Sequence, residues 1–198
     1  MQVNVTIRGL QPLLLHKYTV ASVSDPKARM VKTRDSTTFA DEWRKGTYVD
    51  EGKFLIMPSV NILACLFDGA KGMKIGKKAV TRSVYTSLVV SPIQPRILWS
   101  EDGKKYEEIH IDSIPDRQWL HASGAVISGR RIDRIRTQVP PGWIISFQIL
   151  TKDDALSHDD IKTIVESAGK FAGLGDWRPS SPKKPGPYGV FDIAEFTP

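Results

Sequence analysis

Apolar and polar residues alternate near both ends of the chain with the period of two that is typical of β-strands. Val3, Val5 and Ile7 alternate with polar residues, which predicts a strand over residues 3–9, followed by a further apolar segment within residues 11–18. Residues 143–150 (WIISFQIL) and 189–196 (GVFDIAEF) are rich in β-branched and aromatic residues, and each predicts a strand. Residues 83–92 (SVYTSLVVSP) predict one more, which ends at Pro92.

Two other segments have the i, i+3, i+4, i+7 spacing of an amphipathic helix. The first begins at Pro58 with Ser59 as its cap and ends at glycines 69, 72 and 76. Its predicted buried face consists of Val60, Leu63, Ala64, Phe67 and Ala70. The second begins at the N-cap Ser157 and stops at Gly173. Its predicted buried face consists of Ile161, Ile164, Val165, Ala168, Phe171 and Ala172.

Strand, helix, glycine-rich loop and strand therefore recur in each half of the chain. This order predicts an α+β fold with a ferredoxin-like (RRM-like) βαββαβ core. The length of 198 residues suits one domain, over residues 1–198. Residues 22–53 are polar and without periodicity, so we expect an insertion there, and residues 96–140 are expected to form a second one as loops or hairpins.

The distribution of positive charge bears on the kind of partner, because the basic residues are concentrated in segments that contain almost no acidic residues. The net charge is +6, and basic residues cluster in residues 27–34, 71–82, 130–136 and the last loop. A solvated surface usually mixes both signs, so this pattern favours a polyanionic partner. The candidate phosphate-binding residues are Lys71, Lys74, Lys77, Lys78, Arg82, Arg130, Arg131, Arg134, Arg136, Arg178, Lys183 and Lys184.

Residues 130–136 (RRIDRIR) form the strongest of these segments. In an extended backbone Arg130, Arg134 and Arg136 share one face, and Arg131 lies on the other face with Asp133. Three guanidinium groups at strand spacing suit a row of phosphates. The alternative is an arginine–aspartate ladder on the surface.

The glycine-rich loop over residues 173–189 (GLGDWRPSSPKKPGPYG) follows a helix and precedes a strand. A dinucleotide-binding GxGxxG loop needs the reverse order, and the GKS or GKT ending of a Walker loop is absent. Two interpretations remain. Gly173 and Gly175 are turn glycines of a connector, or they let a nucleic-acid backbone approach while Arg178, Lys183 and Lys184 bind phosphate and Trp177 or Tyr188 stacks on a base.

The chain resembles the RAMP superfamily, RRM-like proteins that include CRISPR effector backbone subunits and CRISPR RNA-processing endoribonucleases. The similarity lies in IRGLQPLLLH, in FLIMPSVNILACLFDGAK and in AGLGDWRP through GPYGVFDI, about half of the chain. It implies that the glycine-rich loop lies close to bound RNA. The SSPKKP extension and Trp177-Arg178-Pro179 depart from the usual loop, as in a stand-alone or phage-encoded member.

Catalytic and metal-binding motifs are scarce. The four histidines show no HxH or HExxH spacing, and the lone Cys65 excludes internal disulfides, so we expect no metal or cofactor and a core cysteine in a cytoplasmic protein. No apolar run is long enough for a transmembrane helix, and the N-terminus is not typical of a signal peptide. The resemblance implies one catalytic alternative, in which His16, beside Tyr18, acts as general acid or base on RNA.

These patterns predict a non-enzymatic protein that binds single-stranded RNA, or secondarily single-stranded DNA, without sequence preference. It would be a subunit of a CRISPR-like antiviral ribonucleoprotein or of an assembly that coats a strand, through self-association or other subunits. Two alternatives stay open: an endoribonuclease that uses His16 on hairpin RNA, and a basic protein that binds an acidic protein partner.

Overall fold

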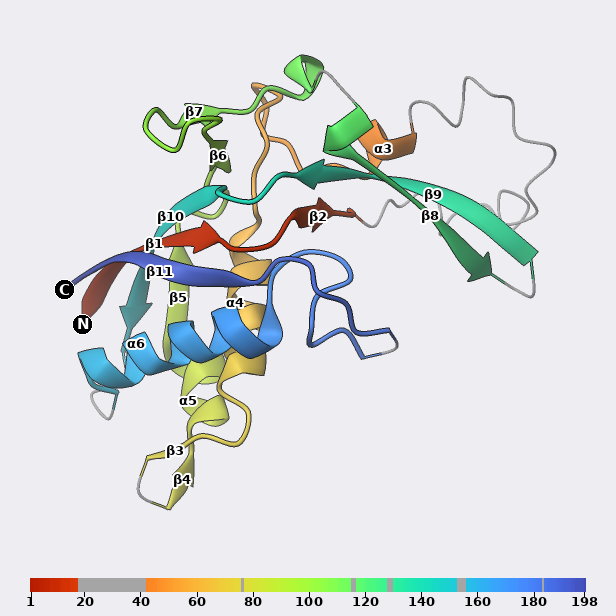
Figure 1. Cartoon of the computed structure of the whole chain (residues 1–198). Coiled ribbons are helices and arrows are strands. Elements are labelled where there is room, and N and C mark those ends of the chain that lie inside the picture. The colour runs from red at the N-terminus through yellow and green to blue at the C-terminus, as the bar shows by residue number, and fades with distance from the viewer. Residues whose placement is uncertain (18–41, 76, 115–116, 128–129, 153–155, 183) are drawn as a thin grey trace.

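A computed structural model of the chain describes residues 1–17, 42–75, 77–114, 117–127, 130–152, 156–182 and 184–198. It is a mixed α+β structure with antiparallel sheets, as the sequence predicts (Figure 1). The central sheet contains β1 (Gln2–Gly9), β10 (Ile144–Thr151) and β11 (Phe191–Thr197) in the order β11-β1-β10. On the free side of β10, one end pairs with β5 (Leu88–Ser91) and the other with β6 (Leu98–Trp99), which β7 (Glu107–Glu108) extends.

Helices cover one face of this sheet, with α4 (Ser59–Gly69), α5 (Val80–Ser87) and α6 (His158–Ser167) on the same side (Figure 1). The alternation read from the sequence gives the buried face, since Val3, Val5 and Ile7 of β1 are almost inaccessible to solvent. The opposite face carries polar pairs where β1 and β10 are neighbours: Thr6 bonds to Ser146 at 2.9 Å, and the Gln148 amide donates to Asn4 at 3.0 Å.

Local sequence signals place α6 correctly. Ser157 and Asp160 form a capping box, in which each side chain accepts a hydrogen bond from the backbone N–H of the other residue. A π-helical segment, η3 (Ala168–Ala172), continues the helix to Gly173, whose φ of 70° ends it. The predicted buried position of Phe171 is wrong, because its side chain is 63% exposed. The wider π turn rotates the last residues away from the 3.6-residue stripe.

The predicted buried face of α4 is also wrong in part. Ile62, Cys65, Leu66 and Gly69 are buried, whereas Val60 is 67% exposed and Ala64 is exposed too. The N-cap is Pro58 without a side-chain bond, instead of Ser59. Two faces of this helix carry apolar residues, and packing against η3 selects one of them. Cys65 is a core residue, and its burial raises the pKa of the thiol.

Residues 83–87 are helical, so the strand predicted over residues 83–92 is wrong in its first half. In α5, Val80 and Val84 are buried at i, i+4 spacing, and the strand β5 begins only at Leu88. The β-branched and aromatic residues favour a strand locally, but burial of this stripe beside α4 outweighs that preference.

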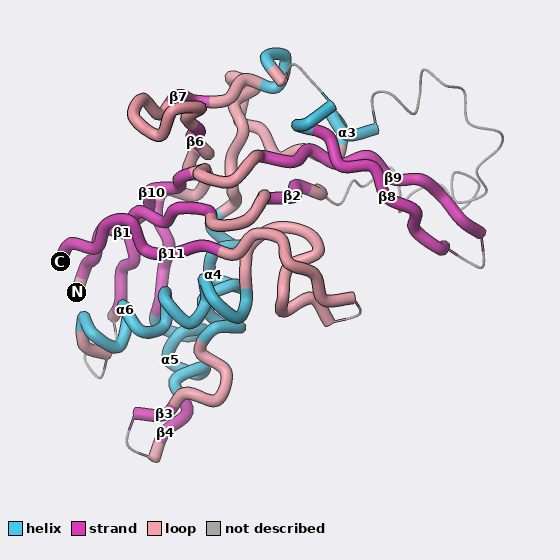
Figure 2. The backbone as a smooth tube through the Cα atoms, in the orientation of Figure 1, coloured by secondary structure: helices cyan, strands magenta, loops and turns pink. Residues whose placement is uncertain are grey.

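The basic segment over residues 71–82 contains short regular elements. These are a two-stranded hairpin, β3 (Lys74–Ile75) and β4 (Lys78–Ala79), and the first turn of α5. The hairpin projects away from the central sheet (Figure 2).

The two expected insertions contain ordered elements. Of residues 22–53, those up to 41 lie outside the described residues, and the remainder contains α3 (Glu42–Lys45) and a bridge from Val49 to Leu55. Residues 96–140 contribute β6 and β7 to the central sheet and form most of a second sheet. In that sheet β9 (Arg130–Val139) lies between β2 (Leu13–Leu15) and β8 (Leu120–Ile127).

The β8–β9 hairpin extends beyond the body of the molecule (Figure 1). Its base is held by α3, where the hydroxyls of Thr47 and Thr137 lie 2.6 Å apart and Trp43 is buried. The short 3₁₀ helices η1 (Ile111–Ser113) and η2 (Arg117–Trp119) lead into β8. Within the described residues, no helix has the length and apolar character needed to cross a membrane.

Candidate nucleic-acid interface

The glycine-rich loop is folded against the N-terminal part of the chain. The N–H of Asp176 donates to the carbonyl of Leu14 at 2.9 Å, and that of Gly189 donates to Pro12 at 2.8 Å. Leu174 is buried, and its N–H donates to Gly189 at 2.9 Å. The two ends of the loop are thereby joined to each other and to β2.

Gly175 and Gly189 are required by the packing of the loop itself. Both have φ near 70° to 76°, a region that side chains rarely adopt. A Cβ atom on Gly175 would overlap the carbonyl oxygen of Leu14, and one on Gly189 would overlap that of Leu174. The space beside these glycines is thus filled by the chain's own backbone, in keeping with the interpretation as turn glycines.

Replacing Gly175 by alanine is expected to lower the free energy of unfolding by about 2 kcal/mol, through backbone strain and overlap with β2. Chemical denaturation measures the change. Gly103→Ala is the matched control, because Gly103 has φ 71° but no atom within 4 Å of its added Cβ. It should lose about 1 kcal/mol from the backbone conformation alone. Equal losses in both variants would show that contact with Leu14 contributes nothing.

Three aromatic rings meet where the loop contacts β8. The rings of Trp177 and Tyr188 are nearly parallel, at 15°, with their centroids 6.1 Å apart. His121 of β8 meets both edge-on, at 5.5 Å from Trp177 and 5.3 Å from Tyr188. The Tyr188 hydroxyl lies 3.1 Å from Nε2 of His121, which fixes the two rings relative to each other. All three are half-buried, so each keeps part of its surface in solvent.

Two cations flank the Trp177 ring. The Lys184 ammonium lies 4.6 Å from its centroid, and the Arg136 guanidinium lies 5.5 Å away. Lys184 is exposed and available to an anion. We call Trp177, Tyr188, His121, Lys184 and Arg136 the ring cluster.

Arg136 has a second role inside the protein. Its side chain is only 10% exposed, and its Nε donates to Asp176 at 2.6 Å while Nη1 donates to Ser123 at 2.8 Å. Burial lowers the pKa of His121, and the nearby Arg136 charge lowers it further. The lowered pKa favours the neutral form of His121, and the ion pair of Arg136 with Asp176 joins the hairpin to the loop.

The arginine segment is extended, as the sequence predicts. Arg134 faces Ser123 and Arg136 faces His121 across the β8–β9 ladder, so both lie on the same face of β9. The backbones of Arg130 and Arg131 pair with Ile127 and Val126. The side chains of residues 130–133 lie outside the described ones, and so does Lys183. The expectation that Arg136 is a freely exposed phosphate ligand is not met, because it is buried and paired.

Of the basic residues that follow α4, Lys71 is joined to the glycine-rich loop through Asp68. Asp68 of α4 accepts hydrogen bonds from Lys71 at 2.6 Å and from Ser180 at 2.9 Å, and Arg178 lies 3.8 Å from it. Lys74 and Lys77 are exposed on the β3–β4 hairpin and Arg82 on α5, while the Lys78 side chain is outside the description. Arg178 also donates to the Gly175 carbonyl at 3.2 Å, so it helps to hold the loop.

His16 lines a polar cavity of about 190 Å³ beneath the loop, together with Tyr48, Asn61, Asp176 and Arg178. Tyr18, its predicted partner, lies outside the described residues. Among the residues that the structure does describe, no three His, Cys, Asp or Glu side chains are arranged to hold a metal ion.

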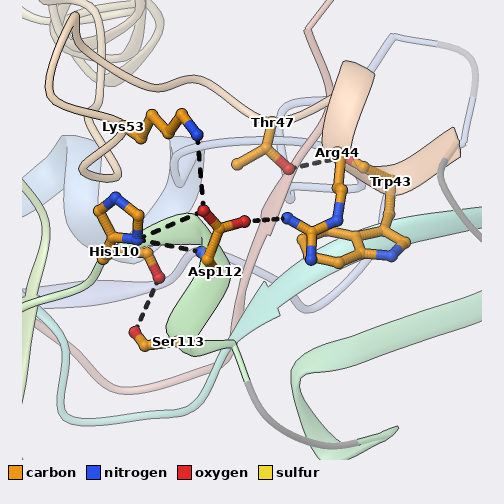
Figure 3. Close-up of polar contacts among 7 residues, drawn as sticks. All are labelled: Trp43, Arg44, Thr47, Lys53, His110, Asp112 and Ser113. Carbon is orange, nitrogen blue, oxygen red and sulfur yellow. Dashed lines mark hydrogen bonds and ion pairs between the residues drawn. The ribbon is translucent and has the colours of Figure 1, made fainter.

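A separate polar cluster surrounds Asp112, where η1 meets α3 (Figure 3). Its carboxylate lies 2.6 Å from Arg44 and 3.6 Å from Lys53, and His110 lies 3.8 Å away. The hydrogen bond from Arg44 lowers the pKa of Asp112. This carboxylate fastens α3 to η1, and we therefore assign the cluster a structural role.

His121, Ser123 and Asp176 had no assigned role in the sequence analysis. The contacts of Arg136 with Asp176 and Ser123 depend on how the glycine-rich loop packs against the β8–β9 hairpin. The spacing of these residues in the sequence does not predict that packing. Asp176 could have been noticed as the one acid among the basic residues of the loop. Comparison with known proteins adds no relative: no protein-family model matches the chain, and no curated protein matches it either.

Proposed function

We propose that this protein binds single-stranded nucleic acid, RNA in the first place, without base specificity. The observation that carries the proposal is the ring cluster, in which partly exposed Trp177 and Tyr188 lie side by side with Lys184 beside them. Aromatic rings stack with bases of any sequence, and neighbouring cations bind the phosphates. The protein acts as a binder rather than as an enzyme.

The residues of the central sheet support placing the bound nucleic acid at the glycine-rich loop and the β8–β9 hairpin. An RRM stacks bases on aromatic residues of its open sheet face. Here the open face of the neighbouring strands β1 and β10 carries Asn4, Thr6, Ser146 and Gln148. These four side chains are not aromatic, so they offer no surface on which a base can stack, in contrast to the ring cluster.

We also propose that the core is ferredoxin-like and that the chain is a RAMP protein. The strand order β11-β1-β10-β5, all neighbours antiparallel, supports this, with α4 between β1 and β5 and α6 between β10 and β11. This is the connectivity of a split βαβ arrangement. On this proposal the protein works as a subunit of a CRISPR-like ribonucleoprotein, or copies of it coat a strand.

Fluorescence anisotropy with labelled homopolymeric RNA and DNA tests the function. Binding should weaken with salt, with a slope that reports on the order of 4 to 8 phosphate contacts at ~0.7 per contact. A flat salt dependence, or no binding at low salt, would reject the proposal and favour an acidic protein partner. Hairpin RNA incubated with the protein should stay intact on a denaturing gel; cleavage abolished by His16→Ala would establish the endoribonuclease alternative instead.

A further inference from the structure

The exposed face of α5 carries an aromatic residue whose position its own packing does not explain. Arg82, Tyr85 and Thr86 lie on this face at i, i+3, i+4 spacing, whereas Val80 and Val84 face the core. Tyr85 is 74% exposed. An aromatic ring usually stabilises a protein by being buried, so an exposed ring contributes little to the stability of this fold. The Tyr85 ring meets Phe67 of α4 edge-on, with the centroids 5.9 Å apart.

The two rings border a shallow hollow of about 310 Å³, lined by Phe67, Thr81, Arg82, Tyr85 and Thr86. Its lining is mostly apolar carbon with a cation at the rim. Such a surface suits a flat aromatic ligand, since most of the Tyr85 side chain is exposed.

Basic residues lie around this hollow, and one of them, Lys71, is paired with Asp68. The Lys71 ammonium lies 5.6 Å from the centre of the Phe67 ring, and Arg82 contributes to the hollow directly. Residues 71–82 contain five basic residues and no acid. Lys74 and Lys77 of the adjoining hairpin are exposed. An aromatic ligand that is also a polyanion fits both features, and a nucleic-acid strand is such a ligand.

The end of α4 connects this surface to the glycine-rich loop. Asp68, next to Phe67, bonds to Lys71 on one side and to Ser180 of the loop on the other. Ser180 follows Trp177 by three residues, so the loop that carries Trp177 also contacts the end of α4 beside Phe67.

We propose that the α5 surface is a second stacking site, which takes a base of the same strand that the ring cluster binds. This inference rests on the proposed function. Arg82 and Lys71 bind the phosphates that flank the stacked base, and Tyr85 stacks on it. A strand that reaches both sites binds more tightly than one that reaches only the ring cluster.

The test compares RNA oligonucleotides of about 6 and about 20 nucleotides, which are short and long relative to typical site sizes. Tyr85→Ala should weaken binding of the long RNA about tenfold and leave the short one unchanged. Tyr85→Phe should retain wild-type affinity, because the ring remains. Trp177→Ala should weaken both lengths.

Phe171→Ala is the matched control, since Phe171 is 63% exposed and has a lysine, Lys170, 5.2 Å from its ring centre. It should bind the long RNA like wild type. The inference is overturned if Tyr85→Ala also binds the long RNA like wild type while Trp177→Ala does not. If wild type binds neither RNA, the proposed function itself fails. Thermal melting of Tyr85→Ala should match wild type, because the ring is exposed.

Discussion

Asp176→Ala is expected to lower the free energy of unfolding by about 3 kcal/mol. The substitution leaves the guanidinium of Arg136 without its carboxylate in a site where the Arg136 side chain is only 10% exposed. It also removes the acceptor of the backbone N–H of Trp177, whose nitrogen lies 3.0 Å from Oδ1 of Asp176. Removing one partner of a buried ion pair is costly, because the remaining charge has lost its water as well. Urea denaturation followed by circular dichroism measures the loss.

Asp192→Ala provides the control for this variant. Asp192 pairs with Arg8 at 2.8 Å, and the side chains are 36% and 49% exposed, so water can replace the lost partner. The expected loss is below about 1 kcal/mol. If Asp176→Ala loses no more than this, Arg136 is better solvated than the structure indicates, and the loop does not depend on this ion pair.

Trp177→Ala is expected to reduce the affinity for single-stranded RNA about 30-fold, because the central ring of the cluster is lost. Alanine keeps a Cβ at the positive φ of 53°, so the backbone strain is the same as in wild type. Trp177→Phe should recover part of the affinity, since a smaller ring still stacks. Anisotropy titrations at constant salt measure both variants, beside thermal melting to verify the fold.

Lysine variants separate stacking from charge at the same place. Lys184→Ala removes the ammonium 4.6 Å from the Trp177 ring and should reduce the salt slope by about 0.7. Lys105→Ala, at an exposed lysine paired with Glu107, should leave the slope unchanged. If Trp177→Ala binds RNA with wild-type affinity, the bound RNA does not stack on Trp177. The arginine segment of β9 and the α5 surface are then the remaining candidate sites.

Local sequence patterns located several elements correctly. Alternation identified β1, Ser157 as the N-cap located the start of α6, and Gly173 marked the end of the helical segment that continues it. These signals act over a few residues, so they need no knowledge of the rest of the fold. Where two local preferences competed, as in residues 83–87, the sequence alone favoured the wrong one.

The candidate site could be predicted only in part. Composition and spacing pointed to Trp177, Lys184 and the arginine segment as candidate binding residues, and the segment is extended in the structure. The contacts of Tyr188 with His121 and of Arg136 with Asp176 could not be predicted, because the partners are 67 and 40 residues apart in the chain. Such contacts depend on which loop folds over which strand.

The sequence by itself determined the α+β composition of the chain, the strands β1, β10 and β11, the helices α4 and α6, and the acid-poor basic segments, since each of these depends on neighbouring residues. Only the tertiary structure decided that Arg136 is buried against Asp176 while Lys184 stays in solvent, and that Gly175 is pressed against β2. The physical reason is that burial is a property of the space around a residue. Segments distant in the sequence fill that space, and their packing decides which charges and rings remain accessible to a ligand.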